Sequence, residues 1–103
     1  MDPKNITTIK YKITKLINVQ HLNLVLPLSL TSLTFICFYN QPTDNLPLGL
    51  TNLIFRSRYN QPTNNLPLGL TSLTFGSDYN QPINNLPLGL KNSTFGYFIF
   101  SFL

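Results

Sequence analysis

Hydrophobic and polar positions repeat along this chain at a fixed interval of 20 residues. Segments 39–58 and 59–78 agree at 15 of 20 positions, and a third copy runs from Tyr79 to about Gly96 in the same register. An earlier partial copy covers 26–35. A fixed short period of this kind is typical of a solenoid, in which successive coils stack and share one continuous core.

One half of each copy predicts a short β-strand. In the run 50–55, Leu53 and Phe55 share one face because side chains alternate along a strand. Asn52 and Ile54 then point to the other face. Stacking at intervals of 20 residues aligns the apolar positions in columns. These columns are Leu30, Leu50, Leu70 and Leu90; Leu33, Leu53 and Leu73; Phe35, Phe55, Phe75 and Phe95; and Tyr39, Tyr59 and Tyr79.

The other half of each copy argues against a helix. The run 42–49 contains two prolines and a glycine, and each proline removes a backbone donor and disfavours helical geometry in the preceding residue. We therefore predict turns and short extended pieces, with Leu46 and Leu48 pointing into the core. Asparagines recur at fixed corners, where we expect them to be buried and hydrogen-bonded to the backbone of their own and adjacent coils. They are Asn40, Asn60 and Asn80, and Asn45, Asn65 and Asn85.

The third copy also carries a family resemblance. The run 73–83, followed by Asn85-Leu86-Pro87, closely resembles the FNIP repeat, a leucine-rich-repeat-like unit named for a Phe-Asn-x-Pro signature that here reads Tyr-Asn-Gln-Pro. The resemblance covers roughly 26–96. Such repeats are known mainly from social amoebae and from giant viruses that infect amoebae. Many relatives carry an F-box, which implies a substrate adaptor of a ubiquitin ligase, but the residues before these repeats do not look like an F-box.

The expected fold is mainly β, a short leucine-rich-repeat-like solenoid of about four 20-residue coils with one short parallel strand per coil and little or no α-helix. We divide the chain into a basic N-terminal arm or partial cap (1–18), the repeat solenoid (19–96) and an apolar C-terminal tail or edge strand (97–103).

Both ends depart from the repeat. Twenty residues before Leu33 and Phe35 lie Ile13 and Lys15, so we expect the arm to keep one core position and lose another. At the other end, Ser93 takes the leucine position of its column.

Charge is scarce and unevenly placed. Only 10% of residues are charged, and the net charge is +4. Residues 1–18 contribute +3, from four lysines against one aspartate, and the remainder contributes +1. Lysines in such a segment are more often solvated than bound to a partner, and we expect neither nucleic acid nor membrane as a partner. A basic-arm binder of nucleic acid or anionic surfaces is the alternative function.

The chain shows no constellation for catalysis or metal binding. His21 is the only histidine, and it lies 16 positions from Cys37, the only cysteine. A nucleophile pair also needs an orienting group, and one Cys, one His and three scattered acids supply no tetrahedral ligand set. We therefore expect no enzyme activity, no catalytic or metal site and no cofactor.

Two further observations concern the compartment. The N-terminal residues show no apolar core followed by a small-residue cleavage site, so we expect the cytoplasm, or the host-cell cytoplasm if the chain is viral. The uncharged stretch between Leu16 and Thr43 contains proline and several amides, which argues against a membrane span.

What remains is a surface for a protein partner. Outward strand positions vary between copies while the core positions stay fixed, as in repeat proteins that bind through one face, although neutral drift gives the same pattern. The candidate partner-binding residues are Asn52, Ile54, Arg56 and Arg58. We predict a non-enzymatic protein–protein interaction module, with a truncated repeat fragment as another alternative. Self-association through the apolar C-terminal edge is also consistent with the sequence.

Overall fold

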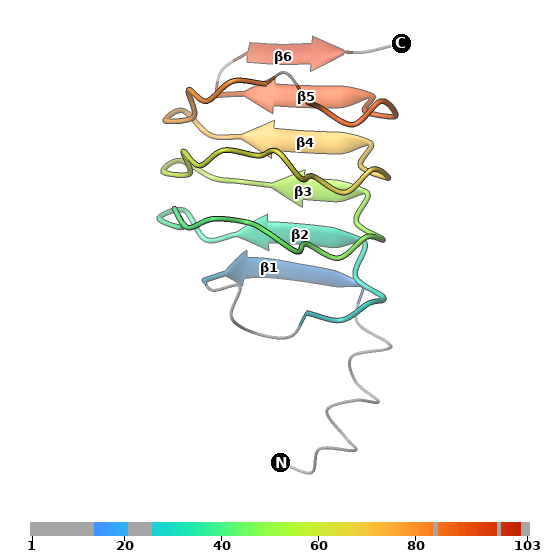
Figure 1. The fold of residues 1–103 in the computed structure, drawn as a ribbon. Helices are drawn as coiled ribbons and strands as arrows, with labels where there is room; N and C mark the ends of the chain where they lie inside the picture. Colours follow the sequence, from blue (N-terminus) through green and yellow to red (C-terminus); the bar gives the residue numbers. More distant parts are fainter. Residues whose placement is uncertain (1–13, 21–25, 84, 97, 102–103) are drawn as a thin grey trace.

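The strands of this protein follow one another along the stack in the order of the sequence (Figure 1). The computed structural model describes residues 14–20, 26–83, 85–96 and 98–101. Those residues form one six-stranded sheet and contain no helix. Its strands are β1 (Lys15–Val19), β2 (Ser32–Phe35), β3 (Asn52–Ile54), β4 (Ser72–Phe75), β5 (Asn92–Phe95) and β6 (Phe98–Ser101).

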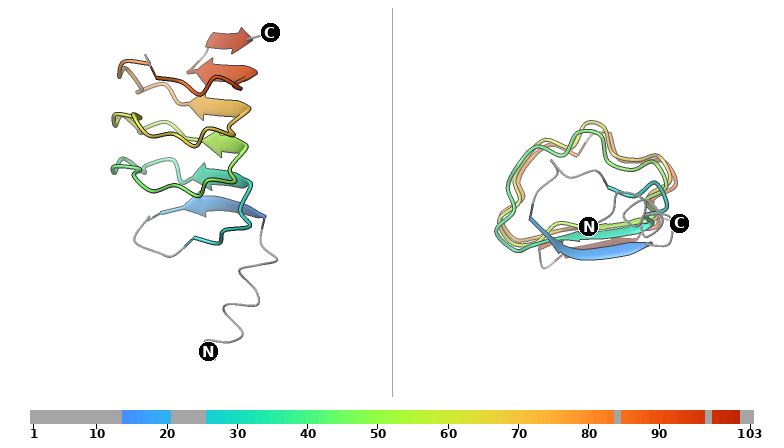
Figure 2. Two further views of the ribbon diagram at one scale, coloured as in Figure 1. Left: turned by 45° about the vertical axis from the view of Figure 1, so that its right-hand side comes forward. Right: turned by 90° about the horizontal axis from the view of Figure 1, so that it is seen from below.

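The register of the sheet confirms the 20-residue solenoid. β2, β3, β4 and β5 pair in parallel, with Leu33 opposite Leu53, Leu53 opposite Leu73, and Leu73 opposite Ser93. Seen end-on, β2, β3 and β4 and the turns that follow them have nearly the same outline, whereas β1 is offset from it (Figure 2). The chain then reverses after Gly96, and β6 pairs with β5 in the antiparallel direction. Gly96 has a φ of +60°, a conformation that glycine adopts without steric cost.

The predicted columns of core residues are present. Phe35, Phe55 and Phe75 are completely buried. The ring centroid of Phe55 lies 5.1 Å from that of Phe35 and 5.5 Å from that of Phe75, and the rings are stacked almost parallel. Phe35, Phe55 and Phe75 each stack on the tyrosine four residues later as well, at 3.8 Å for Phe55 and Tyr59. Each coil therefore buries its aromatic rings against its neighbours, which an isolated coil could not do.

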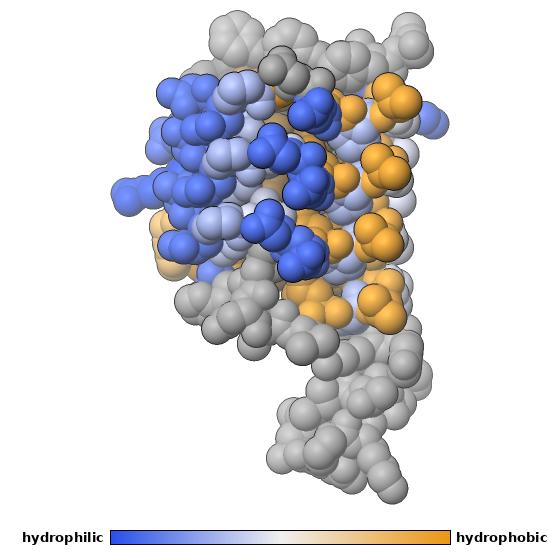
Figure 3. Space-filling view, viewed as in Figure 1, coloured by the Kyte–Doolittle hydropathy of each residue, from blue (hydrophilic) through white to orange (hydrophobic). Residues whose placement is uncertain are grey.

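The prediction that Leu48 points inwards is wrong. The amide of Leu50 donates to the carbonyl of Pro47 at 3.3 Å, which closes a turn. Its ends, Pro47 and Leu50, are buried, whereas its tip carries Leu48, which is 84% exposed. The same turn recurs in each coil, and its exposed leucines form a column along the stack; Figure 3 shows hydrophobic side chains stacked in this way. The column consists of Leu28, Leu48, Leu68 and Leu88.

The asparagine prediction is partly wrong. The corner asparagines are not buried; Asn40 and Asn80 are exposed and Asn60 is half-buried. Bonds between coils are nevertheless present, because the Asn40 Oδ1 accepts from the Asn60 amide at 2.9 Å and from Gln61 Nε2 at 3.1 Å. Asn60 repeats this arrangement with the following coil. The second set, Asn45, Asn65 and Asn85, is also exposed, and Asn45 has a left-handed φ of 62°.

The first coil does not keep the 20-residue spacing. β1 pairs with β2 in parallel, but Leu16 lies opposite Leu33 and Val19 opposite Phe35. Lys15, expected in the phenylalanine column, is exposed and lies opposite Ser32. The shift brings two apolar side chains onto the core in place of a lysine, with an irregularity in register between Leu16 and Val19. β1 spans the boundary expected after residue 18. Residues 1–13 of the basic arm, Ile13 included, lie outside the described residues.

Candidate functional site

The candidate face begins on β3 and continues into the turn that follows it. Asn52 and Ile54 lie on the outward side of the strand and are half-buried. The amide of Asn52 donates from Nδ2 to Ser32 Oγ at 3.3 Å, so it is engaged within the sheet. Arg56 and Arg58 lie just beyond the strand and are exposed.

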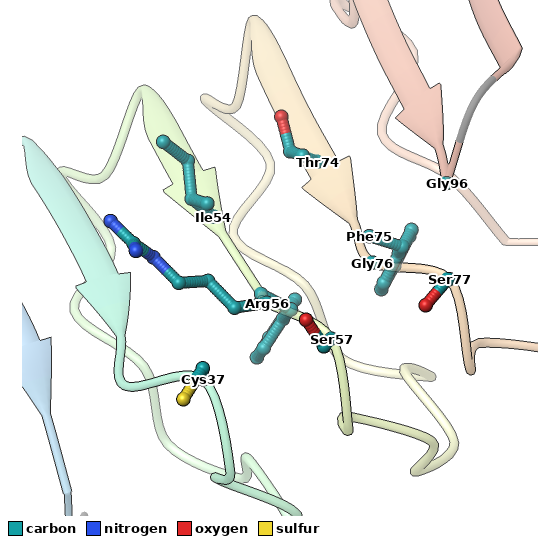
Figure 4. Close-up of a pocket in the computed structure, with 10 residues that line it drawn as sticks. Cys37, Ile54, Arg56, Ser57, Thr74, Phe75, Gly76, Ser77 and Gly96 are labelled. Carbon is teal, nitrogen blue, oxygen red and sulfur yellow. The ribbon is translucent and has the colours of Figure 1, made fainter.

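A shallow, open hollow of about 420 Å³ lies at the ends of β3 and β4. It includes Ile54 and Arg56 but neither Asn52 nor Arg58, so the structure brings together two of the four predicted residues there. In Figure 4 the side chain of Arg56 extends from the end of β3 towards β2. The hollow is lined by Cys37, Ile54, Phe55, Arg56, Ser57, Thr74, Phe75, Gly76, Ser77 and Gly96.

Gly76 has a structural role that the repeat pattern did not predict. A Cβ atom on Gly76 would lie 2.5 Å from the carbonyl carbon and oxygen of Arg56, and 2.7 Å from the Cα of Ser57. These are backbone atoms, so no side chain can move aside. The residue at this position therefore cannot be exchanged freely for a larger one. The signal was a glycine where the preceding coils have large side chains.

The charge of the face is positive on the coil of β3. Arg56 and Arg58 both lie on this coil, whereas Gly76 and Asp78 occupy the equivalent positions on the next one. Arg56 therefore places a positive charge in the hollow that the half-buried Ile54 also lines. Guanidinium groups form paired hydrogen bonds with carboxylates.

Two tyrosine hydroxyls join adjacent coils through hydrogen bonds. Thr43 Oγ1 and the Tyr59 hydroxyl share a hydrogen bond of 2.8 Å between adjacent coils, and Thr63 and Tyr79 share one of 2.9 Å. Burial raises the pKa of Tyr59 well above its ordinary value of about 10, although the bond to Thr43 opposes the shift. The phenol therefore stays neutral near pH 7, where it joins two coils.

Reactive side chains are sparse in the part of the chain that the structure describes. That part contains no group of three or more side chains able to hold a metal ion. Cys37 is a free, exposed thiol at the rim of the hollow. His21 lies outside the described residues, so its predicted inert role stays a prediction. A search of the described residues for a helix able to cross a bilayer finds none.

Comparison with known families confirms the resemblance for part of the chain. The family model described as FNIP Repeat matches residues 59–98, which span the second and third full copies of the unit. The matched region includes β4 and β5 and the tyrosine signature at Tyr59 and Tyr79. A repeat domain with a solenoid fold is typical of non-enzymatic modules. No curated protein matches the chain.

Proposed function

We propose that this FNIP-repeat solenoid is a non-enzymatic protein–protein interaction module whose outward sheet face, around the hollow at Ile54 and Arg56, binds a protein partner. The observation that carries the proposal is the pairing of an exposed arginine with a half-buried isoleucine in one shallow hollow. Arginine is enriched at protein interfaces, and energetic anchors tend to lie where an apolar contact excludes water from a charged one.

The scaffold beneath this face supports the proposal because it is held from coil to coil. Phe55 and Phe75, which line the base of the hollow, are completely buried and stacked on each other. The backbone of Arg58 is bonded to the preceding coil through the carbonyl of Cys37 at 3.1 Å. A site on such a support loses little conformational entropy when a partner binds.

The partner we expect presents a carboxylate beside an apolar side chain. Arg56 supplies a planar cation for the carboxylate, and Ile54 supplies an apolar surface next to it. Arg58 adds positive charge on the same coil and increases the rate of encounter with an acidic surface. The recognition part of a ubiquitin-ligase adaptor, which the FNIP resemblance implies, is one setting for such a face.

The test compares proteins captured from cells by the natural chain and by the double variant Ile54→Asp plus Arg56→Glu. We expect partners that bind through this face to be lost from the variant, and their binding to the natural chain to be measurable with purified components. Arg56→Glu alone should weaken that binding at least tenfold, since placing like charges together at an interface costs several kcal/mol.

Lys91→Glu is the matched control, because it makes the same charge change at an exposed cation that does not line the hollow. It should leave binding unchanged, apart from a small effect on the association rate. Equal partner sets for the natural chain and the double variant, with both proteins folded by circular dichroism, would contradict the proposal.

A further inference from the structure

We infer that β6 pairs edge to edge with β6 of a second copy, giving a closed two-fold dimer with one sheet running through both copies. β6 is the last strand of the sheet, and among the described residues it is paired only with β5. An edge strand presents unpaired backbone N–H and C=O groups along its outer side. Another strand of the same kind satisfies them.

The two edges of the sheet differ in how they are protected. β1, at the other edge, carries Lys15, an irregular register and a left-handed Asn18 with a φ of 56°. Charges and irregularities of this kind block strand addition. β6 and the residues that follow it contain no charged residue and no proline. The unprotected edge is therefore the C-terminal one.

The core is also incompletely covered at that same end. Phe95 and Leu86 are only half-buried, whereas their equivalents in the inner coils, Phe75 and Leu66, are buried. Tyr79 is half-buried as well, whereas Tyr59 is completely buried. A second copy stacked on this end would cover these side chains in addition to pairing β6. The open strand edge and these half-buried side chains lie at the same end, so one docked copy would cover both.

The geometry of the pairing is restricted by symmetry. A two-fold axis makes the two β6 strands antiparallel, and residues that face each other must both direct their N–H and C=O groups outward or both inward. Because these directions alternate along a strand, the residue at the axis must lie opposite the same residue of the second copy. In the four-residue strand Phe98–Ser101, this residue is Ile99 or Phe100. The assembly stops at two copies because the pairing occupies the β6 edge of each copy.

The dimer would extend the sheet without turning it over. A two-fold axis perpendicular to an antiparallel pair keeps the same face of the sheet on the same side in both copies. The hollow at Ile54 and Arg56 would then appear twice on one side of the dimer. The inference does not depend on the function proposed for that hollow, and its test uses the chain without any partner.

The first experiment measures the mass of the purified full chain in solution by sedimentation equilibrium. We expect a concentration-dependent equilibrium between 11.7 kDa and twice that mass. Ile99→Lys or Phe100→Lys, whichever residue lies on the axis, should raise the dissociation constant at least roughly tenfold because it brings like charges together. Ile17→Lys, at the 60% exposed Ile17 of β1, is the matched control and should leave the dimer unchanged.

The second experiment uses cysteine cross-linking, which does not require a destabilising charge. In a chain whose exposed Cys37 is replaced by serine, single cysteines are placed at each of the four β6 positions. Facing residues of an antiparallel pair lie about 4.5–5.5 Å apart at Cα, within reach of a disulfide. We expect rapid dimer formation for Ile99→Cys or Phe100→Cys, and slow formation for Phe98→Cys and Ser101→Cys.

Three results would overturn the inference. One is a monomeric mass at every concentration from micromolar to millimolar. Another is equal cross-linking at all four β6 positions. The third is association through the exposed leucine column instead, seen as a series of larger oligomers or as a dimer abolished by Leu48→Gln and Leu68→Gln.

Discussion

Ser93 offers the sharpest test of the stacked core. It lies opposite Leu73 in the column formed by Leu33, Leu53 and Leu73, and it is completely buried. Its Oγ has no hydrogen-bond partner. A buried polar group without a partner costs about 1–3 kcal/mol. The side chain is therefore both too polar and too small for its position.

Two substitutions separate these defects. Ser93→Ala removes the unpaired oxygen and should raise the free energy of unfolding by about 1 kcal/mol or more. Ser93→Leu should add about 1.5–3 kcal/mol beyond that, the value of burying a leucine side chain. For a domain of this size, each 1 kcal/mol shifts Tm by roughly 4–8 °C. Leu73→Ser, which creates the same defect one coil earlier, should cost at least about 2–5 kcal/mol.

The measurement is urea unfolding followed by far-ultraviolet circular dichroism, supported by the fluorescence of the chain's five tyrosines, since it has no tryptophan. All variants are compared at one protein concentration because self-association would add to apparent stability. A lower midpoint for Ser93→Ala would show that the hydroxyl is favourably bonded. A midpoint for Ser93→Leu below that of Ser93→Ala would show that the column does not continue into β5, which would refute the register argument.

Three further predictions test the contacts between coils. Gly76→Ala should lower the free energy of unfolding by more than about 1 kcal/mol, because its methyl would lie 2.5 Å from the Arg56 backbone. Gly69→Ala is the control, since its methyl would lie 3.6 Å from the nearest atom, the Leu50 carbonyl oxygen; equal urea midpoints for the two variants would contradict the close approach. Asn60→Ala should cost about 1 kcal/mol in urea unfolding, since Asn60 Oδ1 accepts from the next coil, whereas a similar loss for Asn80→Ala would argue against the ladder. Because burial raises the pKa of Tyr59, its hydroxyl loses its proton at lower pH in the unfolded chain than in the folded one. Its contribution to the free energy of unfolding is therefore fully present below about pH 10 and falls above it, by up to about 1.4 kcal/mol per pH unit. Tyr59→Phe should flatten that fall, and an unchanged pH profile of the unfolding midpoint would refute the assignment.

The sequence is a better guide to the core than to the surface. The columns at Leu53 and Phe55 could be predicted because identical apolar residues 20 apart have no reason to recur unless they are buried together. The hollow was only partly predictable. Ile54 and Arg56 were identified as outward and variable, but their grouping with Thr74 and Gly76 depends on how two strand ends and two turns lie beside each other.

The sequence by itself determined the period, the parallel order of β2 to β5 and the identity of the core columns. The reason is that apolar residues repeated every 20 positions are all buried together only when successive coils stack in register. Only the tertiary structure decided the direction of Leu48, the close approach at Gly76 and the shortened first coil that pairs Leu16 with Leu33. These depend on which turn closes and how near two backbones come. Side-chain hydrophobicity carries no information about either.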